Sequence, residues 1–474
     1  MKGVTKQMYT SYSAKRLGEI FSRNRSVYFI GIGGISMSSL AHIAHDRGCR
    51  VGGYDRTPSA LTRSLESCGI GISYELDPKH IEPYEVIVYT AAIKPDNPEL
   101  AYALECDRRG EKYCVYRADF LGWLMSGCKN RIGVAGMHGK STATSMISQI
   151  FLSAGLDPTI VLGAELPAIG GTYRIGSRDN FIMEACEYQD SFLSFTPNIA
   201  VVLNIELDHT DYFSGIDQII GSFRKYLAIA SDGYAVVNTD SANVRAALEG
   251  YTGRIVSFGL ESDADFTAAD IRFVHGCAEF DIFKQGRKFT HIKLGVTGRH
   301  NIMNALASAA AADICGVPAE AIAAGLAEYA GAKRRMELRG SFLTESGASV
   351  PVYDDYAHHP TEIRATLSGA KDMGYRRVFV VFQPHTYSRT ASLFDEFAGS
   401  FGGVNAIFAD IYAARETNTF GVSSEKLAKA AGGIYLPSLD GIADYLRRTL
   451  TDGDMLIVMG AGDIIRLDDL LLKK

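Results

Sequence analysis

The sequence predicts an α/β fold in three domains, each built on a largely parallel sheet. Short apolar strands alternate with helical segments along the chain, the pattern of proteins whose parallel strands are connected by helices. Two glycine-rich turns, at 31–34 and 136–139, each join such a strand to a helix. A chain of 474 residues exceeds one ordinary core, and usual domain sizes favour about three units. Breaks near 128 and 333 give the predicted domains 1–127, 128–332 and 333–474.

The composition is typical of a globular protein, with 47% hydrophobic and 22% charged residues. A net charge of −6 does not favour nucleic acid as a partner. Eight scattered cysteines without a Cys-x-x-Cys pair predict reduced thiols and a cytoplasmic location. No stretch reaches the roughly 18 apolar residues of a membrane span, and the N-terminus lacks the apolar core of a signal peptide, so we expect no membrane partner. The sequence does not decide between a monomer and a homodimer.

The first predicted domain opens with a strand–turn–helix–strand unit over 26–55. Its turn consists of Gly31, Ile32, Gly33 and Gly34. Glycines at the start of a helix let the backbone approach a diphosphate closely, which predicts a Rossmann-like nucleotide site. Asp55 ends the second strand, where its carboxylate could accept a hydrogen bond from a ribose or base. Two alternatives are a nicotinamide-dependent oxidoreductase and glycines that serve only tight packing.

The second predicted domain begins with an apolar strand, a Gly-Lys-Ser-Thr turn and a helix over 131–146. The turn contains Gly136, Met137, His138, Gly139, Lys140, Ser141 and Thr142. Backbone N–H groups and the helix dipole favour phosphate there, Lys140 can neutralise it, and the Ser141 hydroxyl suits Mg²⁺. Val134 stands where the general phosphate-loop template has glycine, so the match is to a shortened variant. An ordinary glycine turn, or a nucleotide-binding switch without catalysis, is the alternative.

Two acidic clusters follow strands of the same domain. The first contains Glu184, Glu187 and Asp190, and the second contains Glu206, Asp208 and His209. Ligands of open α/β sheets bind at the carboxyl ends of the strands, so we expect both clusters to flank the phosphate loop. Gathered carboxylates with one imidazole suit Mg²⁺ or Mn²⁺ better than zinc. The alternatives are a solvated acidic loop and a His209 with only a structural hydrogen bond.

The third predicted domain, Rossmann-like and mainly parallel, places two polar clusters directly after strands near 349–355 and 376–383. These clusters contain Asp354, Asp355, Tyr356, His358, His359, His385, Tyr387 and Arg389. Their positions at strand ends predict one shared binding crevice. The histidine spacing fits no zinc signature, and capping of loops by Asp and His remains the plain alternative.

Several segments, in order along the chain, together resemble the Mur ligases. These segments are "GIGGISMSSLA", "GMHGKST", "NIELDH", "GRHNIMNALA", "DDYAHHPTE", "FQPHTYSRT" and "DIYAARE". The resemblance implies a UDP-sugar domain, a central ATP-binding domain like that of P-loop ATPases and a C-terminal amino-acid-binding domain. It also implies an ATP-dependent ligase of peptidoglycan synthesis that joins L-alanine to UDP-N-acetylmuramate through an acyl phosphate. A ligase that attaches a recycled murein tripeptide to the same sugar nucleotide is the alternative.

The same resemblance implies roles for individual residues. It places the UDP-sugar diphosphate on 31–34, ATP on 136–142, and adenine at Asn301 and Asn304. Magnesium would be held by Ser141, Glu184 and His209, and the third domain would close on the nucleotide with Arg335 and Asp355. The implied catalytic residues are Lys140, Glu184, His209 and Arg335, and the implied alanine pocket contains Tyr356, His358, His385 and Arg389.

Overall fold

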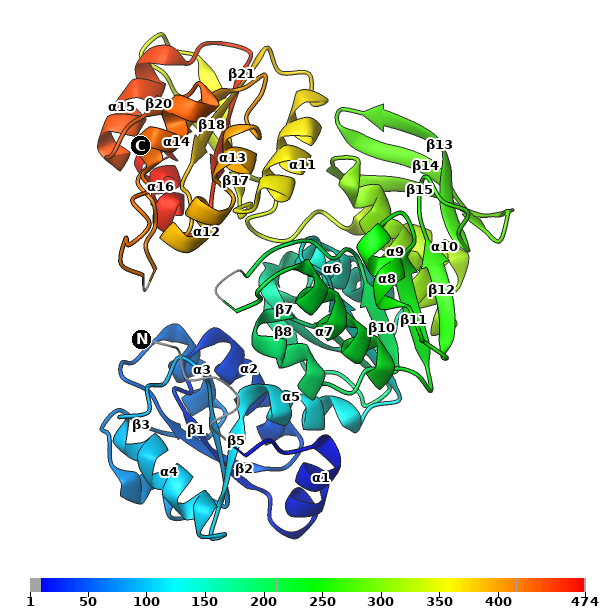
Figure 1. The fold of residues 1–474 in the computed structure, drawn as a ribbon, viewed down its shortest axis with the longest axis vertical. Helices are drawn as coiled ribbons and strands as arrows, with labels where there is room; N and C mark the ends of the chain where they lie inside the picture. The colour runs from blue at the N-terminus through cyan, green and yellow to red at the C-terminus, as the bar shows by residue number, and fades with distance from the viewer. Residues whose placement is uncertain (1–9, 210–211, 415, 473–474) are drawn as a thin grey trace.

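The computed structural model describes residues 10–209, 212–414 and 416–472. Three sheets of five, ten and six strands follow one another along the chain. Figure 1 shows them as an N-terminal part in blue to cyan, a central part in cyan to yellow-green, and a C-terminal part in yellow to red. The predicted three-part α/β fold is thereby confirmed. The boundaries 1–127, 128–332 and 333–474 remain predictions, and their ends at 1–9 and 473–474 lie outside the described residues.

The N-terminal sheet is parallel, with the order β3-β2-β1-β4-β5. Its strands are β1 Ser26–Ile30, β2 Arg50–Tyr54, β3 Gly71–Ser73, β4 Val86–Tyr89 and β5 Tyr113–Tyr116. Its helices are α1 Ala14–Arg23, α2 Ile35–Asp46, α3 Ala60–Ser67, α4 Pro98–Arg108 and α5 Arg117–Ser126. All five residues of the middle strand β1 are buried, as an apolar run covered on both faces requires. The chain order reverses between β1 and β4, where such sheets bind ligands.

The central sheet has the order β15-β14-β13-β12-β11-β10-β6-β9-β7-β8. Its strands are β6 Asn130–Ala135, β7 Thr159–Leu166, β8 Gly171–Arg174, β9 Asn180–Glu184, β10 Ile199–Val202, β11 Tyr234–Asn238, β12 Arg254–Phe258, β13 Phe266–Val274, β14 Cys277–Lys284 and β15 Arg287–Thr297. Its helices are α6 Lys140–Ser153, α7 Ile216–Ile229, α8 Ala242–Ala247, α9 His300–Ile314 and α10 Ala319–Glu328. The alanine-rich α9 lies close to α6, and Ser308 donates a hydrogen bond to the Ala143 carbonyl at 3.3 Å.

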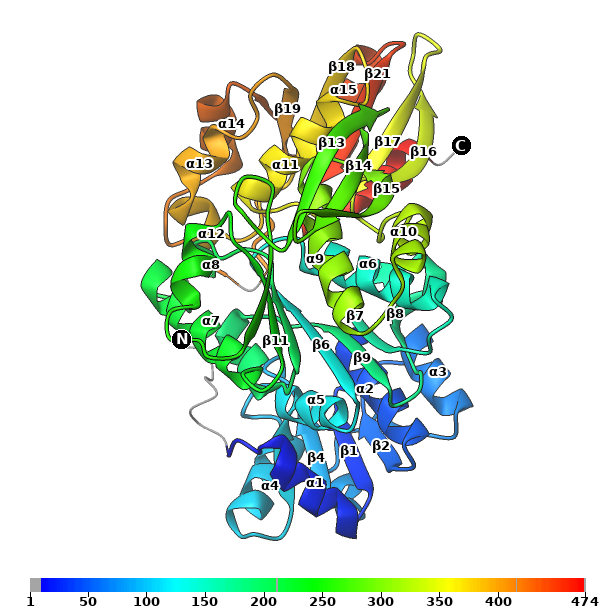
Figure 2. The ribbon, with the colours of Figure 1, turned by 90° about the vertical axis from the view of Figure 1, so that its right-hand side faces the viewer.

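Strands β13 to β15 form an antiparallel meander that the sequence analysis did not predict. Figures 1 and 2 both show it rising from the central part beside α11 (Pro360–Lys371) of the C-terminal part. A Cβ added to Gly276, in the turn between β13 and β14, would lie 2.9 Å from Cγ of Met373. The meander thus supports the C-terminal part where it meets the central one.

The C-terminal sheet has the order β16-β17-β21-β18-β19-β20 and is parallel except for β16. Its strands are β16 Glu337–Leu343, β17 Ser349–Asp355, β18 Arg377–Phe382, β19 Asn405–Phe408, β20 Ile434–Tyr435 and β21 Asp454–Met459. Its helices, besides α11, are α12 Tyr387–Ser392, α13 Phe394–Ala398, α14 Ser424–Ala431, α15 Leu439–Thr449 and α16 Arg466–Leu472. The predicted strands and mainly parallel pairing are confirmed, whereas the antiparallel edge strand β16 was not predicted.

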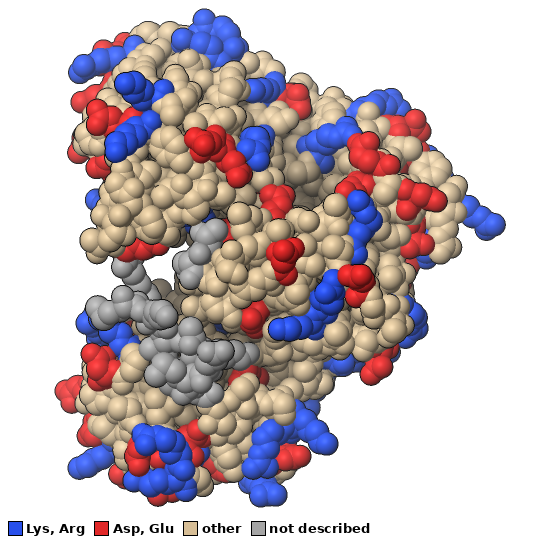
Figure 3. Space-filling model, viewed as in Figure 1, with Lys and Arg blue, Asp and Glu red and all other residues tan. Residues whose placement is uncertain are grey.

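The N-terminal and central parts share an apolar core, whereas polar contacts join the central and C-terminal parts. One buried cluster includes Phe29 and Phe120 of the first part and Phe181 of the second. A Cβ on Gly122 of α5 would lie 2.0 Å from the Ser194 carbonyl oxygen, so only glycine allows this close approach. On the face shown in Figure 3, basic and acidic side chains are interspersed, and the molecule is notched between its top and bottom parts. None of the described helices is long and apolar enough to span a bilayer.

Candidate active site

The phosphate loop lies between β6 and α6 and needs its glycines. Gly136 and Gly139 have φ of 145° and 79°, which side chains rarely adopt. A Cβ on Gly139 would also lie 2.7 Å from Oδ1 of Asn304. Asn204, just past the end of the neighbouring strand β10, fixes the loop, because it accepts from the His138 N–H at 2.9 Å and donates to the His138 carbonyl at 3.0 Å. The loop is therefore a preformed cradle.

Lys140 forms a buried ion pair at the start of α6. Its ammonium nitrogen is 3.0 Å from a carboxylate oxygen of Glu187 and also donates to the Gly136 carbonyl. His209 Nε2 is 3.0 Å from the other oxygen of Glu187. Burial alone would raise the pKa of Glu187, but the Lys140 charge and the His209 hydrogen bond lower it. Burial alone would lower the pKa of Lys140, but the charge of Glu187 raises it. Lys140 and Glu187 are thus both charged at neutral pH.

Glu187 is a site residue that sequence reasoning placed in the acidic cluster without giving it a role. The signal was its position three residues after Glu184 and just beyond the end of β9. Its side chain is fully buried, which an unpaired carboxylate would not tolerate. The structure therefore makes Glu187 the link between the phosphate-loop lysine and His209.

The three predicted metal ligands, like Lys140 and Glu187, lie at the carboxyl ends of strands of the central sheet. Ser141 Oγ donates to Glu184 at 3.0 Å, and the other Glu184 oxygen accepts from the Gly163 N–H at 2.7 Å. His209 contacts Glu187, the partner of Lys140, and its φ of 51° places its backbone in the left-handed region. A hydroxyl, a carboxylate and an imidazole are donors that suit Mg²⁺ or Mn²⁺, and the metal site formed by these three residues stays a prediction.

A cavity of about 440 Å³ lies between the central and C-terminal parts. Its lining includes these predicted nucleotide-binding residues: His138, Gly139, Thr142, Asn301, Asn304, Arg335 and Asp355. Further lining residues that were not predicted include Phe258, His300, Met303, Tyr329 and Glu362. The signal for Phe258, Met303 and Tyr329 was weak, because apolar and aromatic residues are ordinary in a core. His300 and Glu362 stand within the segments "GRHNIMNALA" and "DDYAHHPTE", whose resemblance could have pointed to them.

Arg335 and Asp355 occupy the C-terminal wall of that cavity. Asp355 ends β17 and accepts from the N–H groups of Met336 at 3.0 Å and Ala357 at 2.8 Å. Burial raises the pKa of Asp355 to about 6. Arg335 lies 3.5 Å from a carboxylate oxygen of Glu362 and 5.5 Å from the ring centre of Tyr356. The wall therefore presents to the cavity a cation that neighbouring groups hold in place.

The two polar clusters of the C-terminal part lie next to each other, and the binding crevice expected between them stays a prediction. The rings of His358 and His385 are 6.0 Å apart, and Arg389 Nη1 is 3.4 Å from His385 Nδ1. Arg389 also donates twice to one oxygen of Asp208, at 3.1 Å each. Burial would raise the pKa of Asp208, but the charges of His209 and Arg389 lower it. Arg415, in the resembling segment "DIYAARE", lies outside the described residues.

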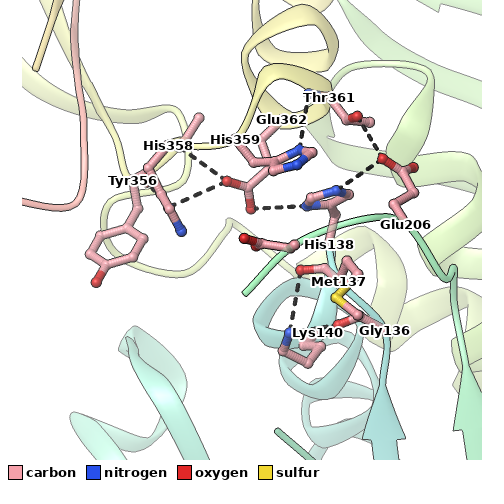
Figure 4. Close-up of polar contacts among 12 residues, drawn as sticks. Gly136, Met137, His138, Lys140, Glu206, Tyr356, His358, His359, Thr361 and Glu362 are labelled. Atoms are coloured by element: carbon pink, nitrogen blue, oxygen red, sulfur yellow. Dashed lines mark hydrogen bonds and ion pairs between the residues drawn. The ribbon is translucent and has the colours of Figure 1, made fainter. Parts of the chain in front are cut away.

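A polar network joins the phosphate loop to the start of α11 (Figure 4). Glu206 accepts from Thr361 at 2.7 Å and lies 3.3 Å from His138 Nε2. His359 Nε2 is 3.2 Å from the Leu207 carbonyl oxygen. Burial would lower the pKa of His138, but hydrogen bonds to Glu206 and Glu362 raise it to about 9. A charged His138 therefore bridges the two parts.

The first glycine turn is stabilised by the residue predicted to contact ribose or base. The Asp55 carboxylate accepts from the Gly33 N–H at 2.7 Å, and Gly31 has φ of 81°. Helix α2, which follows the turn, packs toward the central sheet, since His42 stacks on Tyr173 of β8 with ring centres 5.3 Å apart. Asp55 thus shapes the turn, and its contact with a ligand stays a prediction.

Known proteins match this chain along nearly its whole length. Residues 26–128 match the family model "Mur ligase family, catalytic domain", 134–312 match "Mur ligase middle domain", and 334–462 match "Mur ligase, glutamate ligase domain". The UDP-N-acetylmuramate--L-alanine ligase of Acetivibrio thermocellus is 46% identical over 95% of this chain and 96% of its own. The ligase of the same name from Clostridium acetobutylicum is 44% identical over 95% and 98%.

Among solved structures, a UDP-N-acetylmuramate-alanine ligase from Thermotoga maritima superposes with a TM-score of 0.74, at 23% identity, covering 94% of this chain and 98% of that one. A murein peptide ligase from Psychrobacter arcticus superposes with a TM-score of 0.67, at 24% identity, covering 95% and 98%. These two likenesses concern the fold. With the family models and the relatives above 40% identity, they show that the chain belongs to the Mur ligase family.

Proposed function

We propose that this chain is a cytoplasmic ligase that joins L-alanine to the carboxylate of UDP-N-acetylmuramate, with ATP converted to ADP and phosphate. Such a ligase serves the synthesis of peptidoglycan precursors for the cell wall. The proposal is supported by relatives of that name at 40 to 46% identity over about 95% of the chain. The structural observation that carries it is one cavity bounded by both the phosphate loop and the C-terminal part.

The N-terminal domain, 1–127, binds the UDP-sugar in this proposal. The diphosphate lies against the turn of Gly31, Ile32, Gly33 and Gly34, where a helix begins. The Gly33 N–H is already bonded to Asp55, so the turn keeps its shape before the ligand arrives. The shared core between this domain and the central one fixes the position of the glycine turn relative to the phosphate loop.

The central domain, 128–332, binds ATP between the phosphate loop and Asn301 and Asn304. Ser141, Glu184 and His209 hold Mg²⁺, which neutralises phosphate charge when bound. Lys140, positioned by Glu187, and Arg335 from the C-terminal domain provide cations for the transferring phosphoryl group.

The reaction proceeds in two steps. A carboxylate oxygen of the sugar acid attacks the γ-phosphorus of ATP, the bond to the bridging oxygen breaks, and ADP and an acyl phosphate form. The amine of L-alanine then attacks the acyl carbon, loses a proton and displaces phosphate. Water would hydrolyse the acyl phosphate, so the C-terminal domain, 333–474, is proposed to cover the cavity during both steps.

L-alanine binds in the crevice of Tyr356, His358, His385 and Arg389. A guanidinium suits a carboxylate because its planar N–H groups can bind both oxygens. Arg389 is preformed for this task, since His385 and Asp208 already hold it.

The test is phosphate release from ATP with UDP-N-acetylmuramate and four acceptors: alanine, serine, glycine and a murein tripeptide. We expect alanine to give the highest kcat/KM, and preference for the tripeptide would refute the proposal. Lys140→Ala should abolish amide formation, because the transferring phosphoryl group loses one of the cations proposed to neutralise it. Lys129→Ala, which removes an exposed lysine just before β6, is the matched control and should behave as wild type.

A further inference from the structure

We propose that Glu362 is a positioning residue that couples the phosphate loop to the alanine pocket. One of its carboxylate oxygens faces the ATP cavity and the other holds the pocket histidine His358. The inference rests on the proposed function, because it assigns the pocket to L-alanine. None of the residue roles predicted from the sequence involves Glu362.

The two oxygens of Glu362 have different neighbours. Oε1 lies 3.5 Å from Arg335 Nη1 and 3.7 Å from Nδ1 of His138 in the phosphate loop. Oε2 accepts from the His358 backbone N–H at 3.1 Å and lies 3.4 Å from His358 Nδ1. Figure 4 shows this carboxylate between His138 and His358, on the first turn of α11. A single side chain thus contacts groups from both substrate sites.

Glu362 is ionised in this position. Its side chain is only 10% exposed, so burial alone would raise its pKa, but the charges and hydrogen bonds of its neighbours hold the pKa well below the ordinary value. A buried carboxylate with cations on one side and a backbone donor on the other has little freedom to rotate. The orientation of α11 is thereby tied to the phosphate loop.

The contact with His358 also fixes what that ring offers to a ligand. Burial lowers the pKa of His358 to about 4, so its imidazole is neutral. Two acceptors face Nδ1, the Tyr356 carbonyl at 3.0 Å and Glu362 at 3.4 Å, which places the N–H on Nδ1. Nε2 is then an acceptor, the group that an amine N–H of L-alanine requires.

The experiment compares Glu362→Gln with a matched control across the same interface, Glu206→Gln. Both glutamates contact His138, but Glu206 accepts a hydrogen bond from Thr361 and, among the described residues, forms no hydrogen bond or ion pair with His358. For Glu362→Gln we expect the KM for L-alanine to rise about tenfold, the effect of losing one hydrogen bond to a charged group. The KM for UDP-N-acetylmuramate should change by less than about twofold, because the substitution is expected to affect the alanine pocket and not the binding of every substrate.

Equal increases in the alanine KM for both variants would show that Glu362 only helps the domains to dock, and would overturn the proposal. No increase for either variant would overturn it as well. Thermal unfolding checks that each variant folds. If Glu362→Gln does not fold, Glu362→Asp replaces it; this variant keeps the charge on a shorter side chain and should give an alanine KM between that of wild type and an increase of about tenfold. Wild-type protein without alanine-dependent phosphate release would instead refute the proposed function itself.

Discussion

Glu187→Gln should destabilise the protein far more than the loss of a surface ion pair of the same length. Glu187 and Lys140 are 3.0 Å apart, with side chains 0% and 16% exposed. Arg224 and Glu249 are also 3.0 Å apart, but their side chains are 45% and 82% exposed. The variant Glu249→Gln therefore serves as the control, because it removes the same charge at the same distance and differs in burial.

The expected magnitudes follow from that difference. Removing one partner of a buried pair leaves an uncompensated charge and costs about 3–5 kcal/mol, whereas an exposed pair is worth about 0–1 kcal/mol. For a domain of roughly 200 residues, each kcal/mol shifts the Tm by about 2–4 °C. We therefore expect Glu187→Gln to lower the Tm by about 6 °C or more, and Glu249→Gln by at most about 4 °C.

The assay is thermal unfolding of the full chain without nucleotide or divalent cation, followed by circular dichroism at several heating rates. Ligands are omitted because anything that binds the folded state raises the Tm. A Tm decrease for Glu187→Gln no larger than that for Glu249→Gln would refute the reasoning. It would mean that Lys140 finds another partner or remains hydrated when Glu187 loses its charge.

Three further predictions concern the loop, pH and metal. Gly139→Ala should raise the KM for ATP at least about tenfold, because its Cβ clashes with Asn304 and φ is positive; an unchanged KM contradicts this. The folded-state pKa of His138, about 9, lies above its ordinary 6.5, so its stabilisation is complete below pH 6.5 and lost as the pH rises through 9. The Tm difference between wild type and His138→Gln should accordingly shrink between pH 7 and 10, and a constant difference would argue against the ion pairs with Glu206 and Glu362. EDTA should abolish alanine-dependent phosphate release and Mg²⁺ or Mn²⁺ should restore it, with activity in EDTA counting against the metal site.

Local patterns predicted the elements that carry the chemistry. The β6 strand, the glycine loop and α6 appear where the sequence places them, because the apolar run, the glycines and the helix start all act over a few residues. The same holds for the strands β17 and β18 of the C-terminal sheet. The meander β13 to β15 and the edge strand β16 were missed. Their strands are partly exposed, so apolar and polar residues alternate only weakly along them, and their pairing depends on the packing of the whole sheet.

The amino-acid order alone determined which side chains stand at the ends of strands, and hence the phosphate loop, the acidic clusters and the two polar clusters of the C-terminal part. The tertiary structure alone decided how they pair: Glu187 with Lys140, Asp208 with Arg389 across 181 residues, and Glu362 with both His138 and His358. Backbone preference and periodicity act over a few residues, whereas the partner of a buried charge is chosen by how whole domains dock.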